Sequence, residues 1–108
     1  MHLIINESSV IEVELADTTY KRIVGLMFKK NIQKGLLLSP NNSIHTFFMK
    51  ESIDVIYLNK HNKIVRISQN MKPWRVGPIV FSGAKTLELP NGSVNLYCLI
   101  VGQMLNFK

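Results

Sequence analysis

The chain has 108 residues, the usual length of one domain. Hydrophobic residues make up 46% of the chain and charged residues 19%, which favours a folded core and argues against intrinsic disorder. A single cysteine, Cys98, excludes an internal disulfide, and its apolar neighbours predict a buried thiol.

The net charge of +6 comes from basic residues spread along the chain. Their one loose cluster is Lys21, Arg22, Lys29, Lys30 and Lys34. A solvated basic face explains this cluster more simply than a phosphate or an acidic partner does. The sequence has no RNA-binding aromatic motif, GXXG loop or zinc-finger spacing, so nucleic acid is not an expected partner.

The apolar segments are short. The first one stops at Ile5, too soon for a secretory signal, and none reaches the length of a membrane span. We therefore expect a cytoplasmic protein.

The N-terminal quarter predicts a hairpin followed by a helix. Apolar runs over 3–5 and 10–15 flank a polar turn, and the second run alternates with Glu12 and Glu14. Asp17 or Thr18 can cap a helix that begins near Thr19. Residues with helical spacing would form its apolar face: Tyr20, Ile23, Val24 and Met27. Gly25 indicates the end of the helix or a close backbone approach.

The rest of the chain is mainly of period two. After a short apolar run at 35–38, strands are expected over 44–50, 53–58, 63–68, 85–89 and 104–107. The one long irregular connection spans 69–83, and Ser93 can cap a short helix over 94–99. Without regular β-α-β alternation, a doubly wound parallel sheet is not expected. The expected fold is a single α+β domain over 1–108, whose mainly antiparallel strands curl into a β-barrel-like sheet with two short helices at its openings.

Charged groups stand among apolar neighbours at several positions. Arg22 interrupts the apolar helix, and Asp54 shares a strand face with Ile56 and Leu58, so it should be half-buried beside a cation. The cations considered for Asp54 are Arg22, Lys50 and Arg66. Glu88 alternates with Thr86 and Ala84, which predicts a less buried face.

Two interpretations fit these charges. An internal salt-bridge network tying the helix to the strands is the simpler one. In the other, Arg22, His45, Lys50, Asp54 and Glu88 converge on a ligand. Phe47 and Met49 would share a strand face with His45. Trp74, in the long connection, either plugs one end of the barrel or lies at the rim of a pocket.

Metal ligation is not expected, because the three histidines, His2, His45 and His61, share no ligand spacing. No glycine-rich phosphate loop is present, and no cofactor is expected.

Four ordered motifs resemble those of domain-of-unknown-function family 192, an uncharacterised family of bacteria and archaea. They are Arg22-x-x-Gly25-Leu26-Met27-Phe28, His45-Thr46-Phe47-Phe48-Met49-Lys50, Asp54-Val55-Ile56-Tyr57-Leu58 and Leu87-Glu88-Leu89-Pro90-x-Gly92. The resemblance spans about 13–104 and implies a small β-barrel-like α+β domain, with no established activity. The chain departs from the family at Phe48, where members often have Trp, and at Gly102-Gln103, where they have Gly-Asp.

The leading functional hypothesis is a non-catalytic binding module for a small ligand or a protein segment. Its site would be a cleft bounded by the helix at Arg22 and the segment from His45 to Lys50. The alternatives are an enzyme that pairs His45 with Asp54 or Glu88 as acid and base, and a weak binder of nucleic acid or anionic surfaces. Oligomeric state is not predicted.

Overall fold

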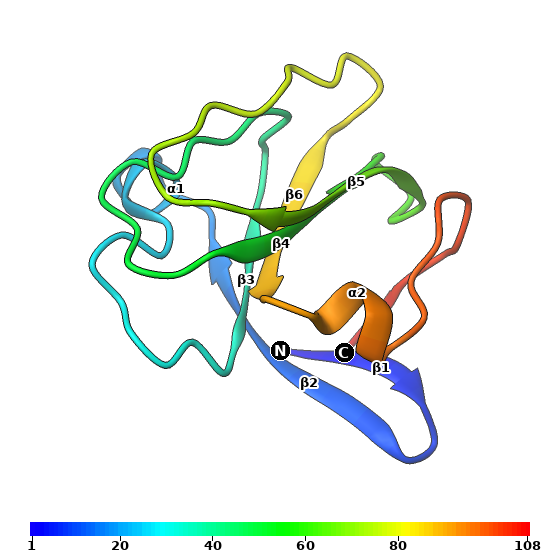
Figure 1. Ribbon diagram of the computed structural model, residues 1–108. Coiled ribbons are helices and arrows are strands. Elements are labelled where there is room, and N and C mark those ends of the chain that lie inside the picture. Colours follow the sequence, from blue (N-terminus) through cyan, green and yellow to red (C-terminus); the bar gives the residue numbers. More distant parts are fainter.

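A computed structural model describes residues 1–108 as one curled sheet of seven strands with two short helices (Figure 1). The strands are β1 (His2–Asn6), β2 (Ser9–Ala16), β3 (Gly35–Leu38), β4 (Ile53–Leu58), β5 (Ile64–Met71), β6 (Lys85–Pro90) and β7 (Asn106–Phe107). Their order in the sheet is β5-β4-β6-β3-β2-β1-β7, and all neighbours are antiparallel except β2 and β3. This half-barrel confirms the predicted fold class. No helix is long and apolar enough to span a membrane.

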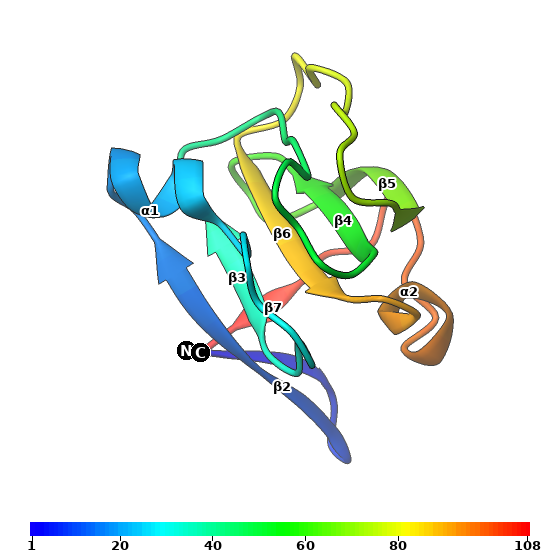
Figure 2. The same cartoon turned by 60° about the vertical axis from the view of Figure 1, so that its left-hand side comes forward.

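The helices are α1 (Thr19–Val24) and α2 (Ser93–Leu96), which lie at opposite ends of the molecule (Figure 2). After α2 the chain runs back along the free edge of β5. There Ile64 donates its N–H to the Gln103 carbonyl at 2.8 Å and accepts from the Gly102 N–H at 2.8 Å. These bonds draw β5 toward β7, which explains why the sheet curls instead of lying open.

Both faces of the sheet are covered, and each has its own hydrophobic cluster. Ile56, Leu87 and Leu89 belong to the cluster beneath α2, whereas Val55 and Tyr57 belong to the cluster beneath the loops. Because alternate side chains of a strand enter opposite faces, a strand covered on both sides must be apolar throughout. This accounts for β4, which is buried at every position.

Helix α1 begins as predicted, because the Thr18 hydroxyl oxygen accepts the Lys21 N–H at 3.1 Å. It ends at Gly25, whose φ of 51° lies in the region that favours glycine. The predicted apolar face is not buried: Tyr20 is 76% and Ile23 is 60% exposed. The helix therefore leaves apolar side chains at the surface.

Two predicted elements are wrong. Residues 44–50 form a loop instead of a strand, with a single bridge between His45 and Val76. The loop bonds instead to the irregular 72–77 segment, and this pairing does not continue as a ladder. Helix α2 spans only four residues, and Ser93 is not its N-cap because its hydroxyl donates to the Pro90 carbonyl.

The thiol prediction is also wrong. Cys98 is exposed, since the turn that follows α2 points this side chain away from the core.

Candidate functional site

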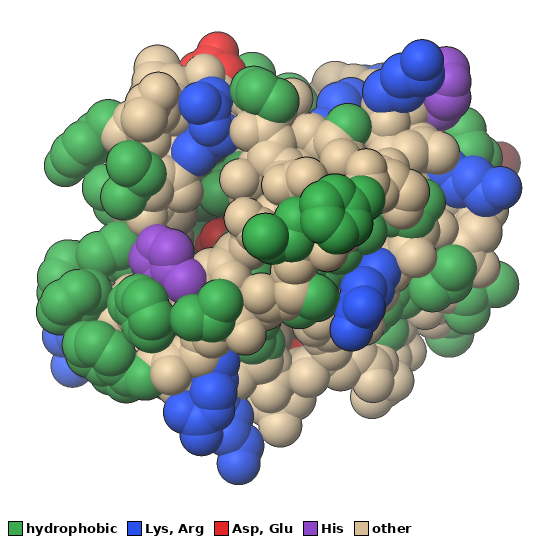
Figure 3. Space-filling view, turned by 90° about the horizontal axis from the view of Figure 1, so that it is seen from above, with side chains coloured by type: hydrophobic (Ala, Val, Ile, Leu, Met, Phe, Trp, Pro, Cys, Tyr) green, Lys and Arg blue, Asp and Glu red, His purple; other side chains and the backbone are tan.

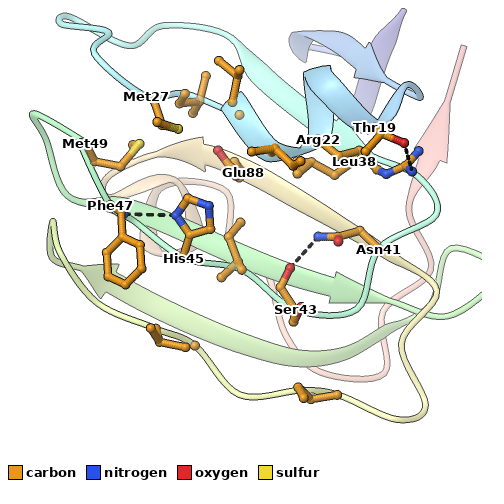
Figure 4. Close-up of a pocket in the computed structure, with 18 residues that line it drawn as sticks. Thr19, Arg22, Met27, Leu38, Asn41, Ser43, His45, Phe47, Met49 and Glu88 are labelled. Atoms are coloured by element: carbon orange, nitrogen blue, oxygen red, sulfur yellow. Dashed lines mark hydrogen bonds between the residues drawn. The ribbon is translucent and has the colours of Figure 1, made fainter.

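A pocket of about 470 Å³ opens between α1, the 41–49 loop and the 76–79 loop. In the space-filling view a hollow is flanked by a histidine and by hydrophobic side chains (Figure 3). Five predicted site residues line this pocket: Arg22, His45, Phe47, Met49 and Glu88 (Figure 4). The structure thus brings together side chains from a helix, a loop and a central strand.

Glu88 reaches the pocket from β6, in the middle of the sheet, and is 3% exposed. Its Oε2 atom has no hydrogen-bond partner. Burial raises the pKa of this carboxyl to about 8, so it is mainly protonated at neutral pH. The prediction of a less buried face is wrong, because the loops around the pocket cover the face that Thr86 and Glu88 share.

Glycine is required where α1 ends beside this carboxyl. A Cβ atom at Gly25 would lie 3.2 Å from Glu88 Oε1, in addition to the positive φ. The backbone of the α1 C-terminus therefore packs directly against the carboxyl group.

His45 lies across the pocket from Glu88 (Figure 4). Its Nδ1 accepts the Phe47 N–H at 3.2 Å, and its ring stacks on Phe47 with centroids 5.0 Å apart. An imidazole that accepts through Nδ1 is left with Nε2 as its donor. His45 can therefore donate a hydrogen bond to a ligand.

Arg22 lines the pocket but its guanidinium turns toward Thr19, away from Glu88 (Figure 4). It donates to the carbonyl of Asp17 at 2.8 Å and to that of Ser39 at 3.5 Å. These bonds hold α1 to the end of β3, so Arg22 has a structural role.

A series of contacting rings runs from the surface to the pocket, and we call it the aromatic track. Its members are Phe28, Phe48, Trp74, Phe47 and His45, with ring centroids 4.7–5.9 Å apart along the series. Phe28, Phe48 and Trp74 all have a positive φ, which is rare for bulky residues and is often found at functional sites.

Trp74 is 56% exposed and does not line the pocket. It therefore does not plug the half-barrel; it lies at the surface and contacts Phe47, which lines the pocket.

Thr46 fastens the loops beneath the aromatic track, and sequence reasoning missed this role. Its fully buried hydroxyl donates to the Lys72 carbonyl at 2.6 Å and accepts the Arg75 N–H at 2.8 Å. The Thr46 carbonyl also accepts the Trp74 N–H at 2.9 Å. A threonine between a histidine and two phenylalanines was the only available signal.

A second buried polar atom lies behind the pocket wall. Burial raises the pKa of the Tyr57 hydroxyl, and the nearby side chains of Ser68 and Arg66 act in the opposite direction. A Cβ atom at Gly77 would approach this hydroxyl to 2.8 Å, so the 76–79 loop can pack here only with glycine at that position.

Asp54 lies elsewhere, and the expectation of a half-buried carboxylate beside a cation is wrong. It is 1% exposed, and its two oxygens accept the backbone N–H groups of Asn70 and Val94, each at 2.9 Å. Since Val94 belongs to α2, Asp54 ties that helix to the sheet. Asp54 and His45 therefore do not form the proposed acid–base pair.

The salt-bridge network is also contradicted. The ion pairs of the structure join Lys34 to Glu12 at 3.4 Å and to Glu14 at 3.8 Å, on the surface. Lys50 is exposed and outside the pocket. The structure shows no group of three or more His, Cys, Asp or Glu side chains that could hold a metal.

The fold and the pocket define a small α+β half-barrel domain with one acidic group enclosed in an apolar cleft. The chain belongs to the DUF192 family, described as "Uncharacterized ACR", whose model matches residues 2–107. This confirms the resemblance inferred from the motifs.

Two similar proteins come from species of Pyrococcus. A UPF0127 protein of Pyrococcus horikoshii is 43% identical over 68% of this chain and 71% of its own length. Another from Pyrococcus furiosus is 35% identical over 91% of this chain and 88% of its own. A crystal structure of a protein of unknown function from Novosphingobium aromaticivorans shares the fold, with a TM-score of 0.81 and 19% identity over 98% of this chain and 82% of that one.

Proposed function

We propose that this domain is a non-catalytic binding module that recognises a small molecule or a protein segment through the pocket above β6. The observation that carries the proposal is the Glu88 carboxyl at the pocket floor, buried yet with Oε2 unpartnered. A buried polar group without a hydrogen bond destabilises a fold. Since the chain itself supplies no partner for Oε2, a role in binding would explain why a glutamate stands at this position. A ligand that bonds to Glu88 supplies that partner.

The size and lining of the pocket support the same proposal. A volume of about 470 Å³ lies within the range of small-molecule sites, which are typically apolar with a few polar anchors. Here Met27, Met49 and Phe47 form apolar walls, and Glu88 and His45 supply polar groups.

The enzyme hypothesis retains only the pair of His45 and Glu88, which line the same pocket. The binding proposal explains both side chains without a reaction, and we therefore favour it. Screening wild type against His45→Ala in broad activity assays would expose any turnover that depends on this histidine.

The anionic-surface hypothesis loses part of its basis, because Lys34 of the basic cluster already pairs with two glutamates. We further propose a cytoplasmic location, which cell fractionation can test.

Fragment binding followed by NMR tests the proposal. Sets of neutral, cationic and anionic fragments should shift the amide signals of pocket residues such as Gly25, His45 and Gly77. Ile79→Ser should weaken this binding severalfold, because Ile79 lines the pocket and is 60% exposed. Ile100→Ser is the matched control, since Ile100 is 65% exposed and outside the pocket.

If fragments of all three classes leave the amide signals of the pocket residues unshifted, the proposal of a binding module is refuted. Shifts scattered over the whole surface would refute it equally.

A further inference from the structure

We propose that the ligand presents a primary ammonium group on an aliphatic stem, and that this group docks against the Glu88 carboxyl. The inference rests on the proposed function, and it names the chemistry that the pocket floor selects.

No Lys or Arg side chain of this protein forms an ion pair with Glu88. The sequence contains 13 Lys and Arg residues, yet no ion pair of the structure includes Glu88. The one basic side chain that lines the pocket, Arg22, is held by the carbonyls of Asp17 and Ser39. The position opposite the carboxyl is therefore left to a cation from outside.

The backbone beside the Glu88 carboxyl also favours a cation. The C-terminal end of α1 packs against it at Gly25, where a Cβ atom would lie 3.2 Å from Oε1. Carbonyl groups at a helix C-terminus carry partial negative charge and favour cations over anions. The end of α1 therefore favours a cation over an anion beside Glu88.

The space around the Glu88 carboxyl also restricts the shape of the cation. A guanidinium prefers to bond both oxygens of a carboxylate side by side. Oε2 of Glu88 is enclosed, and the Gly25 backbone lies against Oε1, so a compact ammonium group fits better than a planar fork.

The pocket lining between the surface and the Glu88 carboxyl suits an aliphatic stem. Met27 and Met49 supply apolar walls for an aliphatic stem. The aromatic track leads toward the same pocket, and aromatic faces attract cations within about 6 Å.

Docking of an ammonium group has a measurable signature, because it favours the ionised form of Glu88. Glu88 by itself is mainly protonated at neutral pH, since burial raises the pKa of its carboxyl to about 8. Binding therefore sends a proton from Glu88 to solvent, and affinity should rise close to tenfold per pH unit below about pH 8. The amine itself remains charged up to about pH 9, because an alkylammonium has a pKa near that of lysine.

Other titratable or charged groups packed around Glu88 are Arg22 at the end of α1, His45 in the 41–49 loop and Tyr57 on β4. Repeating the titration with His45→Asn separates the histidine from Glu88, because the pH dependence should persist in that variant.

Calorimetry on the whole chain tests the inference. The probes are n-butylamine and the peptide acetyl-Gly-Lys-Gly-amide, with butyramide, butyrate and the matching norleucine peptide as controls. Both the free amine and the lysine side chain present the proposed chemistry, and comparing their affinities distinguishes a small-molecule ligand from a protein segment. In buffers of different ionisation enthalpy, wild type should release nearly one proton per bound amine at pH 7.

Glu88→Gln should weaken amine binding at least tenfold and abolish the proton release. The wild-type measurement stands even if that variant folds poorly. Binding of butyramide or butyrate in preference to butylamine would overturn the ammonium inference and leave the binding module intact. Amine binding without proton release would overturn it as well.

Discussion

Asp54 and Glu88 are two carboxyl groups on neighbouring central strands, and they differ in their hydrogen-bond partners. Both are almost fully buried, at 1% and 3% exposure. Asp54 lies on the face beneath α2, where two backbone N–H groups satisfy it. Glu88 lies on the opposite face, where Oε2 has no partner.

The difference separates a structural acid from a candidate recognition group. A carboxylate that accepts backbone N–H bonds fastens the segments that donate them, whereas an unpartnered acid stabilises nothing in the folded chain. Burial alone therefore does not distinguish the two tasks. The partners do.

The largest expected effect is the pH dependence that Glu88 imposes on stability. Its folded pKa of about 8 lies above the ordinary value of 4.5, so the folded state resists ionisation while the unfolded chain ionises. The free energy of unfolding should fall as pH rises from 4.5 to 8, by about 5 kcal/mol at about 1.4 kcal/mol per pKa unit. Glu88→Gln should remove this loss, so the variant should be far more stable than wild type at pH 9 and similar to it at pH 5.

Urea unfolding at several pH values measures this effect. Glu7→Gln, at an exposed glutamate of the β1–β2 turn, is the control and should follow wild type throughout. Parallel curves for wild type and Glu88→Gln would show that Glu88 has no raised pKa.

Asp54→Asn should be less stable than wild type at pH 9, whereas Glu88→Gln should be more stable. The amide keeps one acceptor but turns an NH₂ group toward a backbone N–H, which should cost about 2–3 kcal/mol, since bonds to charged groups contribute about 1.5–3 kcal/mol each. The loss should be similar at pH 6 and pH 9, and hydrogen exchange should quicken at Asn70 and Val94. Asp17→Asn, at an exposed aspartate, is the control. If Asp54→Asn is as stable as wild type, Asp54 does not stabilise the fold through its two backbone hydrogen bonds.

A smaller effect is expected at the loops that cover Glu88. Thr46→Val keeps the shape of the side chain but leaves the Lys72 carbonyl and the Arg75 N–H without their hydroxyl partner, at a cost of about 2 kcal/mol. Thermal unfolding measures the loss, and Ser82→Ala, an exposed position in the 72–84 loop, should change stability by less than about 0.5 kcal/mol. Equal melting temperatures for both variants would mean that Thr46 does not hold the loops.

The sheet could largely be predicted from the sequence, because period-two runs bounded by turn residues specify strands locally. The hairpin of β1 and β2, the buried β4 and the start of α1 at Thr18 all followed from such patterns. The ordered motifs added the family. These signals need no knowledge of distant contacts.

Most of the errors arise from tertiary contacts that a local sequence pattern does not contain. Alternation placed Glu88 with Thr86 on a wetter face, but the loops 25–34, 41–52 and 72–84 lie over that face. Residues 44–50 have the composition of a strand, yet Thr46 directs their hydrogen bonds to an irregular loop. Likewise, the partners of Asp54 are backbone groups 16 and 40 residues away, which no side-chain pattern reveals.

The floor of the pocket belongs to a strand, whereas its walls belong mainly to the segments that connect the strands, so the two parts can change separately. The acidic anchor is set by the register of β6 between β3 and β4, whereas the walls around it belong to segments that join the strands. Insertions or exchanges in those segments would remodel the opening without altering the sheet. The size of the opening can thus change while Glu88 keeps its depth in the sheet.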